Sequence, residues 1–522
     1  MSGYRLGMDV GGTNTDAVVM DRDMNILGAA KYPTTPDIAT GIFESMDRAL
    51  SQSSVAPGEI ERVMVGTTQC LDALEQRKRL ARVGAIRIGL PCSAEVPPFI
   101  DWPEDLKAAC EGGWAVVGGG FEYDGRPMAD LDEAALGRAL SEFKRKGVES
   151  IAITCVFSPV ATAHERRAAE MVKRAFGPDF PVTLSHEIGS MGLIERENSA
   201  LLNATLVKVA DLAAGGLKRA LLERGIVASC YFAQNDGSAM SLSCATKYPV
   251  LTIGSGAANS IKGAGFLSGL RDCIVIDVGG TSTYVGVLVK GCLRESVGAT
   301  RIAGVRTNFR IPDVVSLNLG GGSVVAKDGG RARILEDSVG YELTRSALAW
   351  GGDTFTLTDA ALALGKLGVK DPACDRRRLD GIDTTLCRKA LALVQKRVED
   401  AIELVREGNQ HAVAVLVGGA SDMLPEYLSG VSEVYRPPHR EYANAVGAAI
   451  ARVSGQVDRL WVYGESEREE TLRIVVAKAV EQAIRAGAAP GTVNVAEIEE
   501  TPLSYLSEDA VRVKVKAWGE PS

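Results

Sequence analysis

Two short motifs in the sequence carry the residue types that could bind a phosphorylated ligand. The segment Asp9–Val19 reads DVGGTNTDAVV and the segment Asp277–Val287 reads DVGGTSTYVGV, so that seven of the eleven positions are identical. Glycines let backbone N–H groups approach phosphate oxygens, and the hydroxyl and amide side chains beside them add hydrogen-bond donors. A carboxylate at the end of an apolar strand is suited to hold a hydrated Mg²⁺ ion against those phosphates. Each motif therefore predicts half of a nucleotide-binding site.

The repetition predicts two hairpins that grip one triphosphate from opposite sides. We expect Asp9 and Asp277 to hold Mg²⁺ or its water molecules. The expected phosphate-binding residues lie in the two turns: Gly11, Gly12, Thr13, Asn14, Gly279, Gly280, Thr281 and Ser282. No Gly-Lys-Ser/Thr follows either turn, so the motif is not a Walker A loop. The alternative is a pair of ordinary β-hairpins from an old duplication, in which the glycines serve turn geometry only.

The two copies differ at one position that matters for chemistry. Asp16 in the first copy is a candidate for orienting the attacking group or a water molecule, whereas Tyr284 stands at the matching position of the second copy. The alternative role for Asp16 is local hydrogen bonding within its hairpin. Tyr284 removes a carboxylate from the second half of the expected site and puts a bulky hydrogen-bond donor there.

These motifs need strands to carry them and helices to cover the strands. Apolar strands alternate with amphipathic helices through residues 4–190, as in mainly parallel α/β sheets, and a long helical segment leads into a second α/β block. From about Gln456 a charged helix and two strand-like segments indicate a small appended α+β piece. We therefore predict an α/β protein in three parts, residues 1–190, 191–455 and 456–522.

Composition and cysteine usage narrow the class of protein. The chain has 522 residues and a net charge of −8, which argues against a basic nucleic-acid-binding surface. It contains no run of 18 apolar residues and enters a strand directly, so we expect neither a membrane span nor a signal peptide. The ten cysteines lack CxxC spacing, which predicts reduced thiols and a cytoplasmic location. The four histidines lack paired spacing, so His186 is expected to be structural rather than a zinc ligand.

The paired motifs resemble the two phosphate hairpins of the actin, hexokinase and sugar-kinase ATPases, and AVLVGGASDM at residues 414–423 resembles their adenosine motif. The chain is further identified as a member of the hydantoinase/oxoprolinase family by an ordered set of stretches over about residues 4–455, including VGTTQCLDALEQRK, VTLSHEIGSMGLIERENSALLNA, IGSGAANSIKGA and LNLGGGSVV. The resemblance implies two actin-like (ribonuclease H-like) ATPase domains with a cleft between them and a small C-terminal α+β extension. ENSALLNATL and ANAVGAAIA would be the two helices that connect these domains.

The same resemblance implies roles for residues outside the two turns. Gly418 and Gly419 would lie beside the sugar and base of the nucleotide. Asn235 and Asp236, in the turn AQNDGS, would line the substrate, and Glu197 would lie on the substrate side. The alternative for Glu197 is a charged first helical turn that the helix dipole favours.

The activity that the resemblance implies is ATP-dependent opening of a cyclic amide, such as a hydantoin or a lactam, through phosphorylation of the carbonyl oxygen. ATP and Mg²⁺ are the implied cofactors, and a second subunit of the hydantoinase B type is the implied partner in a homo- or hetero-oligomer. The alternatives are a small-molecule kinase, a carboxylase subunit of the same family, and a non-catalytic ATP-binding regulator. Tyr284 gives the last of these some weight.

Overall fold

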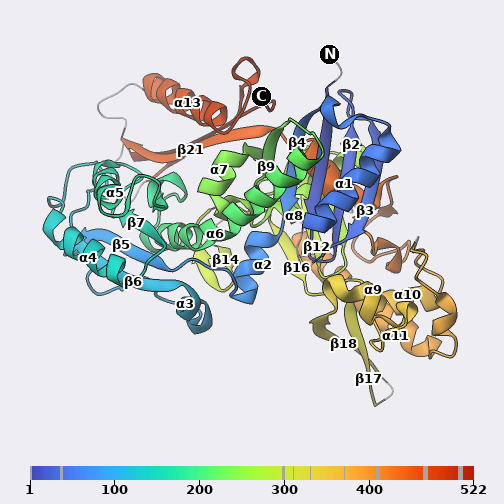
Figure 1. Ribbon diagram of the computed structural model, residues 1–522. Helices are drawn as coiled ribbons and strands as arrows, with labels where there is room; N and C mark the ends of the chain where they lie inside the picture. Colours follow the sequence, from blue (N-terminus) through green and yellow to red (C-terminus); the bar gives the residue numbers. More distant parts are fainter. Residues whose placement is uncertain are drawn as a thin grey trace.

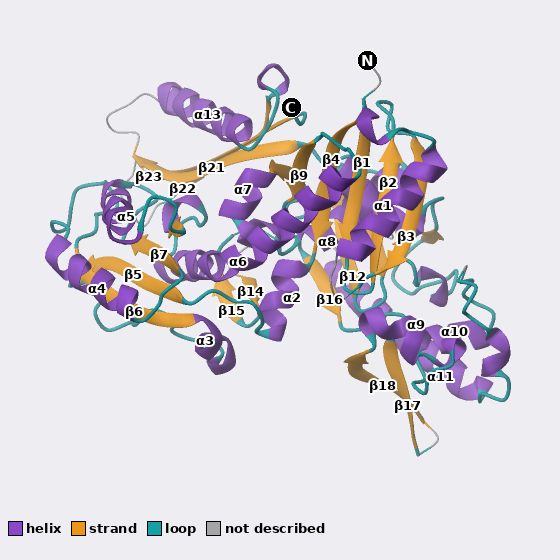
Figure 2. Cartoon of the chain, viewed as in Figure 1, coloured by secondary structure: helices purple, strands orange, loops and turns teal. Residues whose placement is uncertain are grey.

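The structure is a computed structural model that describes residues 3–35, 39–296, 300–309, 311–329, 331–369, 371–406, 412–462, 468–503 and 510–522. A nine-stranded sheet runs across its upper part (Figure 1; Figure 2). In spatial order its strands are β22 (Asn494–Pro502), β23 (Ala510–Gly519), β21 (Val453–Val462), β10 (Ala239–Ser241), β9 (Ser229–Ala233), β4 (Ile60–Thr67), β1 (Tyr4–Val10), β2 (Asn14–Met20) and β3 (Ile26–Pro33). The helix α1 (Ala39–Ser53) packs on β2 and β3.

The sequence prediction of an α/β fold is confirmed, but the large sheet is mixed rather than mainly parallel. The strand β1 pairs parallel with β4 and antiparallel with β2, because the glycine turn after Val10 reverses the chain at once. The strands β21, β23 and β22 are also antiparallel neighbours. Strands from all three predicted parts of the chain therefore lie in one sheet, and the division at residues 190 and 455 stays a prediction.

A second sheet of six strands carries the second glycine motif. Its strands are β13 (Cys292–Leu293), β12 (Thr283–Val289), β11 (Cys273–Val278), β19 (Val413–Val417) and β20 (Glu433–Tyr435), with β16 (Val314–Leu317) also paired to β12. The helix α11 (Thr384–Val405) packs on β12 and β16. Asp383 caps this helix by accepting the backbone N–H groups of Thr385 and Leu386. Its apolar residues recur every three or four positions, so one face is buried against the sheet.

Two helices that are rich in small residues pack against each other between these sheets. They are α8 (Ser255–Ser268), which packs on β11, and α12 (Ala443–Ala449), which packs on β1. A Cβ atom on Gly263 would lie 1.9 Å from the carbonyl oxygen of Ala443, and one on Gly447 would lie 1.9 Å from that of Asn259. Glycine is therefore required at both positions. The helix that packs on α12 between the two sheets is α8. The expectation that ENSALLNATL is the other connecting helix is therefore wrong.

That segment belongs instead to α6 (Leu193–Glu223), which connects the nine-stranded sheet to a separate parallel sheet. This sheet has the order β6 (Glu111–Gly118), β5 (Val83–Leu90), β7 (Ser150–Cys155) and β8 (Val182–Leu184), and carries α3 (Glu104–Cys110), α4 (Glu133–Arg145) and α5 (Ala163–Phe176). It lies on the left of Figure 1. By length and composition α6 could cross a membrane, but 67% of its most apolar window is buried inside the protein, as in a core helix.

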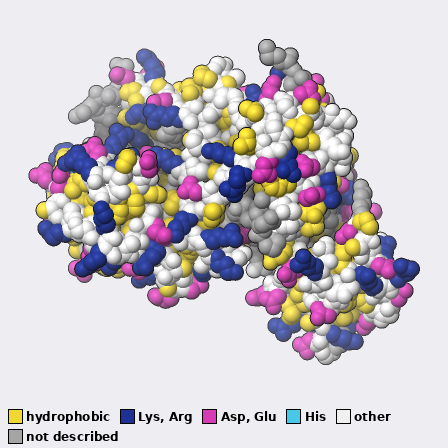
Figure 3. All heavy atoms as spheres, in the orientation of Figure 1, with side chains coloured by type: hydrophobic (Ala, Val, Ile, Leu, Met, Phe, Trp, Pro, Cys, Tyr) yellow, Lys and Arg dark blue, Asp and Glu magenta, His cyan; other side chains and the backbone are white. Residues whose placement is uncertain are grey.

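The remaining elements complete the covering layers. They are α2 (Gln69–Gln76), α7 (Leu242–Lys247), α9 (Leu343–Ser346), α10 (Leu357–Ala363), α13 (Arg468–Arg485), and the hairpins β14 (Thr300–Ile302) with β15 (Val305–Thr307) and β17 (Ser323–Asp328) with β18 (Arg331–Ser338). The helix α13 covers one face of β21 and β23. On the face shown in Figure 3, basic and acidic side chains are interspersed. All ten cysteines are free thiols, as predicted.

Candidate nucleotide site

The two glycine-rich turns face each other, as the repeat predicts. The hydroxyl oxygens of Thr13 and Thr281 lie 2.9 Å apart and share a hydrogen bond. A Cβ atom on Gly280 would lie only 2.5 Å from the Thr13 hydroxyl, so glycine permits this approach. Each turn is closed in the same way, by a backbone N–H donated to a carbonyl three residues later: Gly11 to Asn14 (3.1 Å) and Gly279 to Ser282 (3.0 Å). The chain thus brings together two equivalent backbone turns from two different sheets.

A pair of buried carboxylates lies behind these turns. Asp9 and Asp277 are the penultimate residues of β1 and β11, and each is 5% exposed. The amide of Asn444, in the first turn of α12, donates to Asp9 Oδ2 at 3.3 Å. Burial, together with the carboxylates of Asp16 and Asp277, raises the pKa of Asp9 to about 7. Burial also raises the pKa of Asp277 to about 6, although the nearby ammonium of Lys31 opposes that rise.

Several buried polar atoms beside Asp9 lack hydrogen-bond partners among the described residues. Asp9 Oδ1 and both amide atoms of Asn259 are buried without a hydrogen-bond partner within the part of the chain that the structure describes. A Cβ atom on Gly66 would lie 2.4 Å from Asn259 Nδ2 and 2.7 Å from Asp9 Oδ1, so these groups converge on the end of β4. Buried polar groups without partners are costly, and in native proteins such groups commonly serve a bound ion or water. A carboxylate oxygen with neighbouring amides fits a hydrated Mg²⁺ ion, which typically keeps several waters and takes one or two carboxylates.

Asp16 pairs with a lysine. Asp16 and Lys31 are opposite one another in the β2–β3 register, and Lys31 Nζ lies 2.5 Å from Asp16 Oδ1. Burial raises the pKa of Asp16, and the ammonium of Lys31 opposes that rise. In the β1–β2 register Asp16 is opposite Asp9. The side chain is therefore part of the carboxylate cluster rather than only a local turn residue.

The predicted nucleotide loop follows β19 and lies against Asp277. Gly418 has a φ of +91°, and a Cβ atom there would lie 2.3 Å from Asp277 Oδ1, so only glycine fits. The N–H of Ala420 donates to the carbonyl of Val278 at 2.9 Å, which fixes the loop to the end of β11. Gly419 faces Lys31, whose Cε would be 4.0 Å from a Cβ atom at that position. The loop thus lies beside the carboxylate cluster.

The loop NLGGGS supports the second turn from behind. The N–H groups of Gly321 and Gly322 donate to the carbonyls of Gly279 and Gly280, at 3.0 and 2.7 Å. The hydroxyl of Thr283 donates to the carbonyl of Leu319 at 2.6 Å. The backbone of the second turn is therefore held in place independently of any ligand.

Comparison with known sequences identifies the class of protein. The family profile of the hydantoinase/oxoprolinase N-terminal region matches residues 5–176, and the hydantoinase/oxoprolinase profile matches residues 196–457. The chain belongs to the hydantoinase/oxoprolinase family. Relatives of this hydantoinase/oxoprolinase chain include subunits of a lactamase and of carboxylases.

Caprolactamase subunit alpha of Pseudomonas jessenii is 28% identical over 396 residues, covering 70% of this chain and 55% of the relative. Acetophenone carboxylase gamma subunit of Aromatoleum aromaticum is 26% identical over 394 residues, covering 69% of this chain and 53% of the relative. The match thus spans about half the length of these relatives. The nucleotide-free structure of acetone carboxylase, described as acting by ATP-dependent carboxylation, has a TM-score of 0.74 at 18% identity and covers 100% of this chain and 88% of that chain. This likeness shows that the hydantoinase/oxoprolinase chain shares that fold.

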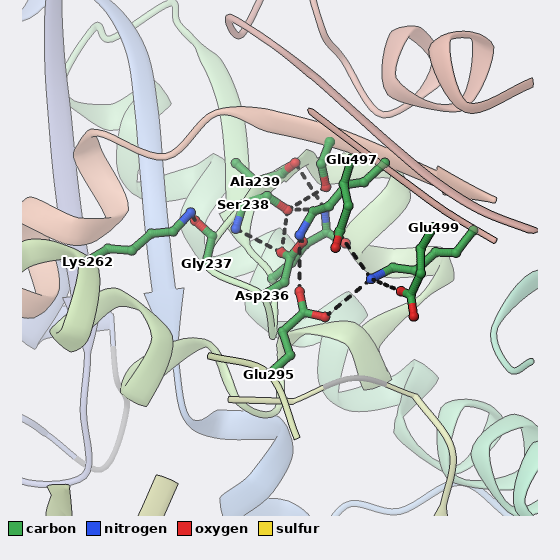
Figure 4. A network of polar contacts seen from close by, with 12 residues as sticks. Asp236, Gly237, Ser238, Ala239, Lys262, Glu295, Glu497 and Glu499 are labelled. Atoms are coloured by element: carbon green, nitrogen blue, oxygen red, sulfur yellow. Dashed lines mark hydrogen bonds and ion pairs between the residues drawn. The ribbon is translucent and has the colours of Figure 1, made fainter. Parts of the chain in front are cut away.

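The predicted substrate-side residues Asn235 and Asp236 have contacts away from the two turns. Asn235 Oδ1 accepts the N–H of Gly254 at 2.7 Å, which holds the start of α8. Asp236 forms an ion pair with Lys516 of β23, whose Nζ lies 2.5 Å from Oδ2, within the polar network of Figure 4. Burial raises the pKa of Asp236, but the ammonium groups of Lys516 and Lys262 hold it well below its usual range. These contacts account for both side chains by internal structure, and their substrate role stays a prediction.

Glu197 and His186 also have structural partners. Glu197 accepts two hydrogen bonds from the fully buried guanidinium of Arg87, at 2.7 and 2.5 Å. His186 Nδ1 lies 2.5 Å from Glu165 Oε2, as expected for a structural histidine. Arg87 lies on β5, so the first pair joins α6 to the four-stranded sheet. Glu165 lies on α5, so the second pair joins that helix to the turn that follows β8. No contact of the described residues joins either pair to Asp9 or Asp277.

Tyr284 is opposite Asp277 in the β11–β12 register, just as Asp16 is opposite Asp9. Burial raises the pKa of the Tyr284 hydroxyl to about 12, with further contributions from Asp277 and from Glu75 and Asp72 of α2. The substitution therefore faces the second carboxylate and an acidic helix of the first half. It gives the site a neutral donor where the first copy has a charge.

The sequence interpretation missed Asn259, Asn444 and Lys31. Both asparagines were visible as amides in helical segments rich in Gly and Ala, and of the two Asn259 is buried and Asn444 half-buried. Lys31 was visible as a charged residue in the strand ILGAAKYP. Each becomes a candidate only once the fold places it beside a carboxylate.

Proposed function

We propose that this protein is an ATP-dependent hydrolase, or a subunit of one, that opens a cyclic amide. The observation that carries the proposal is the contact of Thr13 with Thr281, with Asp9 and Asp277 buried behind the turns. In this proposal the two sheets are actin-like domains, and the nucleotide lies between them. The family membership supports it, because a caprolactamase subunit is among the relatives.

The proposed reaction activates a poor electrophile. The carbonyl oxygen of the amide attacks the γ-phosphorus of ATP, and the bond to ADP breaks. Water then adds to the carbon that bears the phosphorylated oxygen, and the ring C–N bond breaks to give an acyl phosphate and a free amine. A second water molecule hydrolyses the acyl phosphate to a carboxylate and inorganic phosphate. The two turns would hold the phosphates through backbone N–H groups and the hydroxyls of Thr13, Thr281 and Ser282. Asp16 would orient the attacking group or a water molecule.

The residues beside Asp9 would hold Mg²⁺. Asp9 and Asp277 would hold the hydrated ion, with the amides of Asn259 and Asn444 in reach of its waters. When bound, Mg²⁺ neutralises the charge of the phosphates. Gly418 and Gly419 would leave room for the sugar and base.

The proposal includes a partner and a compartment. Relatives are subunits of larger enzymes, so a second subunit of the hydantoinase B type would complete the activity, in a homo- or hetero-oligomer. We propose a cytoplasmic location, which the lack of CxxC spacing among the ten cysteines supports.

Two alternatives have specific support. A carboxylase subunit that phosphorylates a ketone is favoured by the carboxylase relatives. A non-catalytic ATP-binding regulator is favoured by Tyr284, because the second copy lacks the carboxylate of the first.

Phosphate release from ATP tests the proposal. The chain is assayed alone and with the product of a neighbouring subunit gene, against lactams, hydantoins and, with bicarbonate, ketones. Lactam- or hydantoin-stimulated release of phosphate with ring opening is expected. A stable phosphorylated product would identify a kinase, ketone-stimulated release a carboxylase, and ATP binding without stimulation a regulator.

A further inference from the structure

Lys31 is a charged residue of β3 whose side chain forms an ion pair with a buried carboxylate. It lies in β3 of the first sheet, is 29% exposed at its side chain, and pairs with the nearly buried Asp16 at 2.5 Å. A lysine whose purpose is solubility extends into water and makes at most a weak surface pair. Lys31 instead directs its ammonium inward, toward the carboxylates behind the glycine turns.

The side chain also reaches the second half of the molecule. Its Cε lies 4.0 Å from where a Cβ atom of Gly419 would be, in the loop after β19. Its Nζ lies 5.9 Å from the centre of the Tyr442 ring, which precedes α12. Lys31 is therefore bordered by the carboxylate of its own hairpin and by the loop in which the nucleotide is proposed to lie.

The charges around Lys31 are unbalanced. Burial raises the pKa values of Asp9, Asp16 and Asp277, and the ammonium of Lys31 lowers them. Three buried carboxyl groups face a single ammonium group, and buried charges need partners. This arrangement can therefore accept a bound cation together with an anion. Magnesium-bound polyphosphate supplies both, and an ammonium between the two halves is well placed to contact phosphate oxygens.

We propose that Lys31 is a polyphosphate-binding residue and that its ion pair with Asp16 is the nucleotide-free arrangement. When nucleotide enters, Lys31 exchanges the Asp16 carboxylate for a phosphate oxygen, and Asp16 becomes free to accept a hydrogen bond from the group that attacks. The inference rests on the proposed ATP site. It adds a role for a lysine outside the two glycine motifs, contributed by the first half to a nucleotide loop of the second.

Calorimetric titration of ATP, ADP and AMP, each with Mg²⁺, tests the inference on the full chain. Lys31→Met is expected to weaken ATP and ADP binding about 10- to 100-fold while changing AMP binding less than about threefold, since a charged hydrogen bond to the outer phosphates is lost. Lys31→Arg is expected to keep ATP binding within about fivefold. Asp16→Asn is expected to leave ATP binding unchanged or tighter, because it frees the ammonium.

Controls separate this inference from the proposed function and from misfolding. Lys396→Met removes a lysine paired with Asp400 on α11, at 3.5 Å, and should leave binding of all three nucleotides unchanged. Thermal unfolding of each variant reports folding, and Lys31→Arg and Asp16→Asn carry the test if Lys31→Met does not fold. If wild type binds ATP but Lys31→Met binds it equally well, or Asp16→Asn weakens ATP as much as Lys31→Met does, the role of Lys31 is wrong while the ATP site stands. If wild type binds no nucleotide, the proposed function fails and the inference with it.

Discussion

At the scale of single residues, Asn444 is the amide that serves both carboxylates of the candidate site. It donates to Asp9 at 3.3 Å and opposes the raised pKa of Asp277. We predict that Asn444→Ala lowers the free energy of unfolding by about 1 kcal/mol, because a partly buried hydrogen bond to the Asp9 carboxyl group is lost. It should also weaken Mg²⁺-ATP binding. Denaturant unfolding and titration measure the two effects.

The matched control is Asn25→Ala, which removes an asparagine that also bonds an aspartate, Asp21, but on the exposed surface. Its unfolding free energy should change by less than about 0.5 kcal/mol. Equal losses in the two variants would show that Asn444 has no special position.

Which residues of the site could be predicted from the sequence depends on whether their geometry is local. The two turns follow from short motifs, because Asp9 and Gly11 are fixed relative to each other by one strand and one turn. The convergence of Asn259 and Asn444 could not be predicted in this way, because it depends on how α8 and α12 cross. Lys31 became a candidate for the site only through the β2–β3 register and the approach of the second sheet.

At the scale of elements, the crossing of α8 and α12 fixes how the two halves meet. We predict that Gly447→Ala destabilises the protein by more than about 2 kcal/mol, because its Cβ atom would lie 1.9 Å from the backbone oxygen of Asn259. The shift of Asn259 should also reduce nucleotide binding in any protein that still folds. Unfolding and titration measure both effects.

Gly216→Ala is the matched control for this change. Gly216 lies inside α6, and nothing is within 4 Å of where its Cβ atom would be. Alanine there should stabilise the protein by about 0.5–1 kcal/mol, because glycine is a poor helix former. A neutral Gly447→Ala would mean that the two helices are not packed as described.

At the scale of the whole molecule, the same architecture buries three acids between two sheets, and this has a consequence for stability. The pKa values of Asp9 and Asp277, about 7 and about 6, stand above the ordinary value of 3.8. The folded protein therefore holds more protons than the unfolded chain between about pH 4 and pH 7, so stability falls as pH rises through that window. The contribution of these groups is fully present only below their unfolded pKa.

Asp9→Asn removes one of these buried charges and tests the sign of this dependence. Without nucleotide, its unfolding free energy relative to wild type should rise by more than about 1.4 kcal/mol between pH 5 and pH 8, the equivalent of one pKa unit. Asp21→Asn is the control, because hydrogen bonds from Asn25 hold the pKa of Asp21 below its usual range and its contribution is already complete at pH 5. Its difference from wild type should stay constant over that range. A flat profile for Asp9→Asn, measured by denaturant unfolding at each pH, would show that the Asp9 carboxyl is hydrated rather than buried.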